Sequence, residues 1–149
     1  MHVEYHVVIR LLLCTAVSVS LHVAPAAADT RTPREIVLIW TQLYGKDTAR
    51  AAELTTAQFR KGKTVQKWAA DIQLALSAIG YEHLGGEITN ERVIGDIAIV
   101  TVHAHVAAVD GISLQEECYL LKHVHGRWLI DGLDIEKEVV PGGKRRHAI

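Results

Sequence analysis

Cysteine is nearly absent from this chain: of 149 residues, only Cys14 and Cys118 are cysteines. Cys14 lies in a segment that we expect to be removed, and the one remaining cysteine would exclude an internal disulfide. An excess of charge is also lacking, because 16 lysines and arginines face 17 aspartates and glutamates. This balance argues against a nucleic-acid partner. The length suits a single domain, which must be held together by its hydrophobic core.

A long hydrophobic run is lacking as well. The apolar segment 11–17 is much shorter than the about 20 residues that a membrane-spanning helix needs. It follows Arg10 and precedes Ala26-Ala27-Ala28, a small-residue pattern that signal peptidase accepts. We therefore interpret residues 1–28 as a signal peptide that is cleaved before Asp29, and a retained N-terminal anchor is the alternative. The prediction is an exported protein, periplasmic or secreted, with no stable membrane insertion after cleavage.

Helix signals are concentrated in the first half of the expected mature chain. Thr32, Pro33 and Glu35 form a capping box with proline at the first helical position. Apolar residues then recur at helical spacing. Capping residues and stop glycines bound three predicted helices: the first runs from the Thr32 cap to Gly45, the second spans residues 49–54 with Asp47 or Thr48 as its cap, and the third runs from the Thr64 cap to Gly80.

From Tyr81 onward the pattern changes to alternating, β-branched segments broken by glycine or aspartate. A bulge is expected at Gly85-Gly86, and residues 141–149 read as a disordered basic tail. Helices followed by such a meander predict an α+β domain over residues 29–140, with N-terminal helices packed on a curved four-stranded antiparallel sheet. The predicted strands are residues 81–93, 97–109, 113–124 and 127–133.

This layout resembles the nuclear transport factor two-like (NTF2-like) superfamily, a cone-shaped, cystatin-like fold, over about residues 33–135. Three features carry the resemblance: the capped first helix with its Gly45-Lys46-Asp47 turn, the Gly95-Asp96 turn before an Ile/Val/Ala strand, and the closing segment 126–131. More narrowly, the chain resembles small exported members known only as domains of unknown function. The superfamily includes isomerases, dehydratases, polyketide cyclases and non-enzymatic binders, and the fold alone does not choose among them.

Turn positions predict the register of the sheet. Two-residue turns at Asp110-Gly111 and at His125-Gly126 would place His103 opposite Cys118 and His105 opposite Glu116. One sheet face is then almost wholly apolar and should contact the helices. Its members are Ala98, Val100, Val102, Ala104, Tyr119, Leu121, Trp128 and Ile130.

The opposite sheet face has mixed polarity and is expected to face water or a second subunit. Homodimerisation through this face is what the resemblance implies, and its exposed apolar side chains would allow it. The members of this outer face are Ile97, Ile99, Thr101, His103, His105, Glu116, Cys118, Leu120, Lys122 and Leu129.

Two groups of residues are candidates for chemistry. On the outer face, two histidines, a thiolate and a carboxylate are ligand types that zinc or copper accepts. The alternative is that they are ordinary polar residues of an exposed face. That group is His103, His105, Glu116 and Cys118.

The second group should lie on the helix-facing side, towards one end of the sheet. Glu117 and Tyr119 would act as general base and oxyanion donor if burial raises the pKa of the carboxyl group. The alternative is a pocket that only binds, with Tyr119 a satisfied core residue. The predicted pocket residues are Tyr44, His83, Glu117, Tyr119, Trp128 and Asp134.

The sequence favours an exported, non-catalytic domain that binds a small apolar or amphipathic ligand or a protein partner. An acid–base enzyme of the isomerase or dehydratase kind and a metal binder are the alternatives. No cofactor is expected, and no catalytic residue is assigned.

Overall fold

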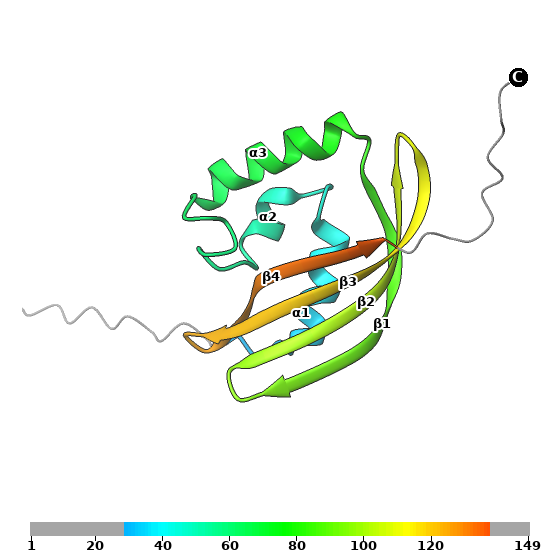
Figure 1. The fold of residues 1–149 in the computed structure, drawn as a ribbon. Coiled ribbons are helices and arrows are strands. Elements are labelled where there is room, and N and C mark those ends of the chain that lie inside the picture. Colours follow the sequence, from blue (N-terminus) through cyan, green and yellow to red (C-terminus); the bar gives the residue numbers. More distant parts are fainter. Residues whose placement is uncertain (1–28, 138–149) are drawn as a thin grey trace, which may run out of the picture.

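The computed structural model describes residues 29–137, so the predicted signal peptide and the 141–149 tail lie outside the described residues. Within residues 29–137, three helices precede four antiparallel strands whose order in the sheet follows the chain (Figure 1). The predicted α+β architecture is therefore confirmed. The helices are α1 (Pro33–Leu43), α2 (Thr48–Ala52) and α3 (Val65–Ala78), and the strands are β1 (Glu82–Ile94), β2 (Ile97–Ala108), β3 (Gly111–Val124) and β4 (Arg127–Lys137).

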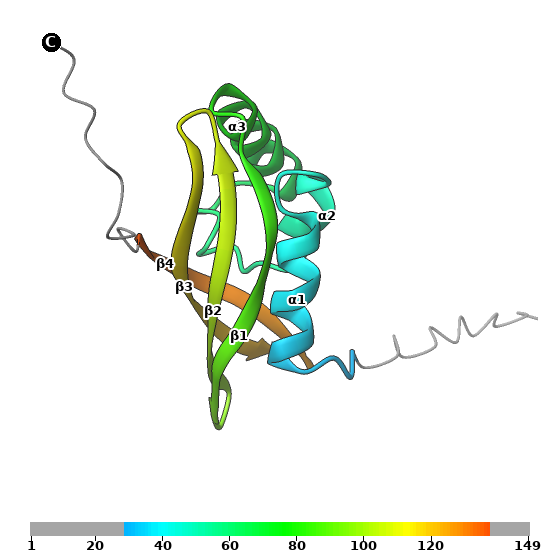
Figure 2. The same ribbon diagram turned by 90° about the vertical axis from the view of Figure 1, so that its right-hand side faces the viewer.

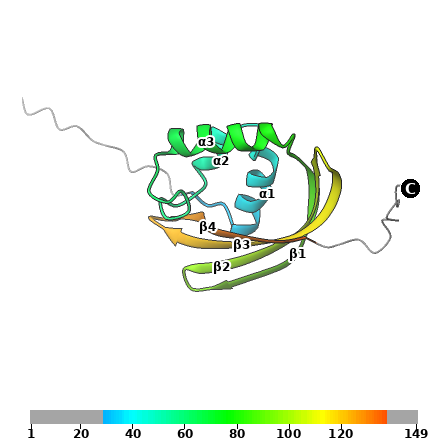
Figure 3. The same cartoon turned by 45° about the horizontal axis from the view of Figure 1, so that its top comes forward.

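The helices cover one face of a curved sheet (Figure 2). α1 contacts β1, β2 and β4 directly, and α2 packs against α3. In Figure 3, α3 runs along the top and α1 lies between it and the sheet. In the described part of the chain, no helix is long and apolar enough to cross a membrane.

α1 begins where its sequence predicts. The Thr32 hydroxyl accepts a hydrogen bond from the backbone N–H of Glu35 (3.3 Å), and the Glu35 carboxylate accepts one from the backbone N–H of Thr32 (2.7 Å). This reciprocal pair satisfies two backbone donors that the first helical turn leaves free. The helix then buries one apolar stripe, which includes Trp40 (1% exposed). Around Trp40 gather the rings of Tyr44, Phe59 and Trp68.

The predicted assignment of sheet faces is confirmed. Ala98, Val100, Ala104 and Leu121 have no exposed surface, whereas the side chains that alternate with them are half-buried or exposed. Because side chains of a strand alternate between its two faces, the buried set marks the concave face under the helices. Trp128 is half-buried at the edge of this core.

The predicted register between β2 and β3 was wrong by two residues. His103 pairs with Glu116, and Cys118 pairs with Thr101 rather than with His103. The turn residues are Val109 and Asp110, since Ala108 pairs with Gly111, which is already the first residue of β3. Gly111 has a φ of 118°, a conformation open to glycine, so it follows the turn instead of forming it. A shift of two residues preserves which side chains share a face.

The register between β3 and β4 follows the prediction only as far as Ile130, which pairs with Leu121. A bulge at Asp131 adds one residue to β4, so Gly132 pairs with Leu120. Alternation is inverted beyond that point. Asp134 is consequently exposed beside Cys118 on the outer face, and its predicted place on the helix-facing side was wrong.

The outer edge of β4 is not open along its whole length. Thr55 forms an isolated parallel bridge with Ile130. The N–H of Ile130 donates to the carbonyl of Leu54 (2.8 Å), and the carbonyl of Ile130 accepts from the N–H of Thr56 (2.9 Å). The connection between α2 and α3 thus covers part of this sheet edge.

At β1, the structure confirms the bulge expected near Gly85 and adds a second irregularity between Ile88 and Asn90. Gly86 lies so close to β2 that a Cβ atom there would be 2.6 Å from the carbonyl oxygen of His103. Only glycine permits this approach of the two backbones.

Candidate functional site

A buried carboxylate lies on the concave face of the sheet. Glu117 in β3 is 1% exposed, although its neighbours Glu116 and Cys118 reach the opposite face. The Tyr119 hydroxyl donates to Glu117 Oε2 (2.6 Å), and the Gln115 side-chain amide donates to Glu117 Oε1 (2.8 Å). Both carboxylate oxygens therefore accept a hydrogen bond from the same strand.

His83 of β1 completes this polar cluster. Its side chain is 3% exposed, and its Nε2 lies 3.5 Å from Glu117 Oε2. The backbone N–H of Gly85 donates to His83 Nδ1 (3.2 Å). Because Nδ1 accepts this bond, the ring proton of a neutral imidazole is on Nε2, the nitrogen nearer the carboxylate. Nε2 makes no hydrogen bond among the described residues, so its contact with the carboxylate is electrostatic.

These contacts set the charge state of the cluster. Burial raises the pKa of Glu117, but the attraction of the neighbouring His83 and the hydrogen bonds from Tyr119 and Gln115 outweigh it and hold the pKa below its usual value. The buried Tyr119 hydroxyl has its pKa raised by burial and by the negative charge of Glu117. The site therefore holds an ionised carboxylate among neutral hydroxyl groups near pH 7. The general-base interpretation depended on a raised pKa of this carboxyl group, and the direction of the shift is the opposite.

A cavity of about 470 Å³ lies next to this cluster, at the end of the sheet beside the C-terminus of α3. In Figure 1 this end is where the chain leaves α3 for β1, beside the β2–β3 hairpin. Its wall is mainly apolar with a few polar groups, as is usual for small-molecule sites. The lining residues are Ile79, Tyr81, Val106, Ala108, Asp110, Ser113, Gln115 and Ile135.

The structure brings together only part of the predicted pocket group. Glu117, Tyr119 and His83 converge. Tyr44 lies near them, because burial and the charge of Glu117 both raise the pKa of its hydroxyl group. Trp128 lies instead near the β3–β4 turn, where its ring is 5.0 Å from that of His123. Asp134 is on the outer face, as described above.

Sequence reasoning missed Tyr81 and Gln115, which join the cavity to the carboxylate. Gln115 is 5% exposed and sits two residues before Glu117 on the same face, so strand alternation was a usable signal. Tyr81 precedes β1, and its ring packs edge-on against Tyr44 (5.5 Å). Burial and the charge of Glu117 raise the pKa of Tyr81.

The predicted outer metal group does not form a cluster. His103 Nε2 is 2.8 Å from Glu116 Oε2, while Cys118 is opposite Thr101 and His105 is opposite Leu114. Over residues 29–137, no group of three or more histidine, cysteine, aspartate or glutamate side chains is placed to hold a metal ion. Metal binding at this face stays a prediction.

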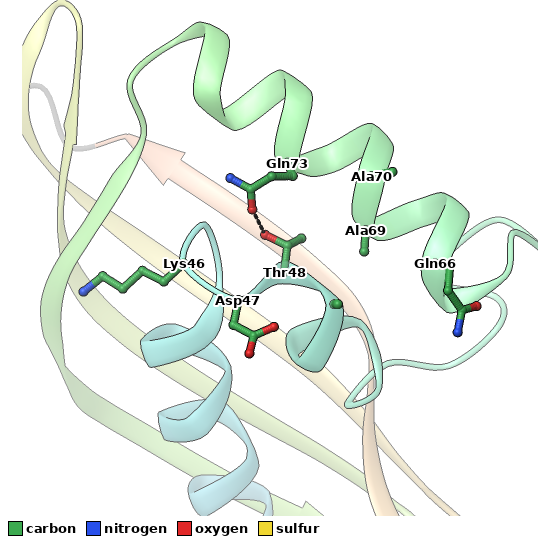
Figure 4. Close-up of a pocket in the computed structure, with 8 residues that line it drawn as sticks. Lys46, Asp47, Thr48, Gln66, Ala69, Ala70 and Gln73 are labelled. Carbon is green, nitrogen blue, oxygen red and sulfur yellow. Dashed lines mark hydrogen bonds between the residues drawn. The ribbon is translucent and has the colours of Figure 1, made fainter.

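A second hollow, of about 480 Å³, lies between α2 and α3. Figure 4 shows Thr48 and Gln73 pointing toward one another across it, with the Thr48 hydroxyl donating to Gln73 Oε1 (2.5 Å), while Lys46 extends away. Asp47 accepts a hydrogen bond from the Arg50 N–H as the cap of α2. Thr48, Gln73 and Asp47 thus use their polar groups within the chain, and no predicted site residue lines this hollow.

Comparisons with known proteins bear on the fold. No protein-family model matches this sequence, and no curated protein matches it significantly. Among solved structures, an NTF2-like protein of unknown function from Pseudomonas putida KT2440 has a TM-score of 0.52 and 12% identity, and the match covers 68% of this chain and 81% of that one. Bd1075 of Bdellovibrio bacteriovorus matches with a TM-score of 0.56 and 9% identity, and this match covers 70% of this chain but only 39% of that one.

A candidate ketosteroid isomerase from Shewanella frigidimarina NCIMB 400 also matches, with a TM-score of 0.50 and 22% identity, over 68% of this chain and 91% of that one. Other matching structures have a cystatin-like fold. The chain therefore has the NTF2-like, cystatin-like fold that the sequence predicts. Identities this low show the fold and not an activity.

Proposed function

We propose that this NTF2-like domain is an exported binding protein without catalysis, which takes a small amphipathic ligand into the cavity beside α3. The observation that carries the proposal is the cavity of about 470 Å³, whose apolar wall ends at the buried polar cluster around Glu117. Apolar side chains would hold the body of the ligand, and Gln115, Ser113 and Tyr81 would orient its polar end.

A pocket acid–base enzyme is the second candidate, favoured by the buried Glu117–His83 pair and by the isomerase-like structural match. Against it, both oxygens of Glu117 already accept hydrogen bonds, and Glu117 is not among the residues that line the cavity. A general base needs its carboxylate within reach of a substrate proton. Isomerisation of a β,γ-unsaturated ketone by the mature protein, absent in Glu117→Gln, would overturn the non-catalytic proposal.

Filling the cavity should abolish binding. Ala108→Phe places a ring where the ligand would lie, so we expect the affinity for the neutral probe 1-naphthylmethanol to fall at least about tenfold. The matched control is Ala107→Phe, because Ala107 is the preceding residue of β2 and its side chain lies on the opposite face. The fluorescence of the probe measures its affinity for both variants. Equal affinities for the wild type and Ala108→Phe would refute the cavity as the binding site.

Export predicts a defined N-terminus. Expressed as the full chain in a Gram-negative host, the protein recovered outside the cytoplasm should begin at Asp29, as read from its intact mass. Ala28→Leu should block processing because the peptidase requires a small residue before the cut. Ala27→Leu is the matched control, since the position between the two small residues is tolerant. An unprocessed wild-type chain would contradict the signal-peptide interpretation.

Pairing of two copies through the outer sheet face is the accompanying proposal. Ile97 and Ile99 are 47% and 39% exposed there, whereas Leu129, also expected on this face, is buried at 7%. Ile99→Lys should convert a dimer into a monomer in sedimentation equilibrium, because it buries a charge at the interface. Leu74→Lys, on α3 and 75% exposed, is the control. A monomeric wild-type protein would refute the pairing.

A further inference from the structure

We propose that the ligand of the cavity beside α3 carries a positive charge, such as an ammonium group, next to its apolar body. This inference rests on the proposed function and adds the chemical class of the ligand. It depends on one feature of the concave face: the Glu117 carboxylate is buried, and no lysine or arginine among the described side chains pairs with it.

The partners of Glu117 are neutral donors. Tyr119 contributes a hydroxyl and Gln115 an amide, at 2.6 and 2.8 Å. His83 is the one ionisable base beside the carboxylate among the described side chains. Its Nδ1 accepts the N–H of Gly85, so Nε2 is the ring nitrogen that faces the carboxylate. Burying a carboxylate without an opposite charge is unfavourable, and a cation brought close to it is correspondingly attracted.

The cavity is connected to that charge through three of its lining residues. Gln115 donates directly to Glu117. Ile135 is the Cα partner of Glu117 across β3 and β4. Tyr81 has its pKa raised by burial and by the charge of Glu117, which places its hydroxyl within the field of the carboxylate. A ligand in contact with these residues is therefore close to the buried charge.

The polar groups of the cavity wall also suit a cationic donor. Of the described residues that line the cavity, Asp110 alone is charged, and it is negative. The Gln115 amide donates one of its two N–H bonds to Glu117, and its carbonyl oxygen is an acceptor that can receive a donor from a ligand. The ring of Tyr81 adds an aromatic surface, which attracts ammonium groups. An anionic ligand would meet the carboxylate of Asp110 in the cavity wall.

Three matched probes test the inference: 1-naphthylmethylammonium, 1-naphthylmethanol and 1-naphthylacetate, which share one ring system and differ in charge. Isothermal titration of the mature wild-type protein should give at least about tenfold tighter binding of the cation than of the alcohol, because opposite charges several ångströms apart in a half-buried site attract that strongly. The anion should bind more weakly than the alcohol. Amide shifts in NMR spectra should map the cation to Gln115 and Tyr81.

The variant Glu117→Gln removes the charge and keeps the shape of the side chain. We expect it to erase the preference for the cation and to leave the affinity for the alcohol within about twofold, since the apolar wall is unchanged. Glu116→Gln is the matched control: it removes the same charge from the adjacent residue, whose side chain is exposed on the outer face. It should bind all three probes as the wild type does.

The outcomes separate the two proposals. If the alcohol and the cation both fail to bind, the proposed binding function is refuted and this inference falls with it. If all three probes bind equally, only the charge preference is overturned. Lys137 is the Cα partner of Gln115, so Lys137→Gln is titrated as well. A cation preference that appears only in that variant would show that the chain already supplies the counter-charge, which also overturns the inference.

Discussion

Replacing Trp40 with alanine is expected to lower the free energy of unfolding by about 3–5 kcal/mol, the range for a large aromatic residue removed from a core. Trp40 is 1% exposed, and its ring stacks on Tyr44 (4.8 Å) and meets Phe59 (5.7 Å) and Trp68 (6.1 Å). These partners come from α1, the connection between α2 and α3, and α3. The cavity left by the substitution would therefore separate helical segments that no disulfide holds together.

Urea denaturation followed by circular dichroism measures this loss. Trp128→Ala is the control, because Trp128 is only half-buried and its ring contacts His123 beside a turn. Trp128→Ala should lower the free energy of unfolding clearly less than Trp40→Ala does. A similar loss for the two variants would show that the aromatic cluster around Trp40 is not the centre of the core.

Replacing Tyr119 with phenylalanine is expected to lower the free energy of unfolding by about 1.5–3 kcal/mol at pH 7, the range for a hydrogen bond to a charged group. The substitution removes the hydroxyl that donates to Glu117 Oε2 at 2.6 Å and leaves a carboxylate with less compensation in a site that is 1% exposed. Tyr44→Phe is the matched control, because no hydrogen bond of the Tyr44 hydroxyl occurs within residues 29–137.

The pH dependence of this loss follows from the direction of the pKa shift. Glu117 has its pKa lowered in the folded state, so its contribution to stability is complete above the unfolded value of about 4.3 and is lost as the pH falls through the folded pKa. Asp29, with its pKa lowered to about 2 mainly by its hydrogen bond with Arg31, acts in the same direction. The wild type should therefore lose stability on acidification.

Removing the Tyr119 hydroxyl raises the folded pKa of Glu117. The difference between the wild type and Tyr119→Phe should consequently be largest near pH 7 and shrink as the pH falls through the lowered folded pKa of Glu117, where the wild-type carboxyl group takes up a proton. Urea titrations at several pH values measure it. A difference that stays constant over this range would mean that Tyr119 does not donate to an ionised carboxylate.

The sequence was sufficient for the layers of this fold because its local signals agree. Thr32 and Thr64 both cap helices as predicted, and the β-branched alternation marked all four strands. The buried face was assigned correctly even though the β2–β3 register was wrong, because an error of two residues leaves the alternation unchanged. An error of one residue would have exchanged the two faces.

The bulge at Asp131 had no local signal, since contacts distant in sequence hold it. The Asp131 carboxylate accepts from the Thr56 hydroxyl (2.5 Å) and pairs with Lys122 Nζ (2.6 Å). Only the folded chain brings these groups together, so Asp134 could not be placed correctly. The cavity could not be predicted for a similar reason, because it forms where the turn after α3 meets the β2–β3 hairpin. The hydrogen bond from the Val109 N–H to the Ile79 carbonyl (2.9 Å) joins these two segments.

The short bridge between Thr55 and Ile130 has a consequence for self-association. An uncovered strand edge is a template on which further chains can polymerise. On the β4 side, the segment around Thr55 already occupies backbone donors and acceptors that an incoming strand would need. On the β1 side, two interruptions break the regular spacing of such groups. Both margins of the sheet are therefore poorer templates for strand addition than an uncovered, unbroken edge.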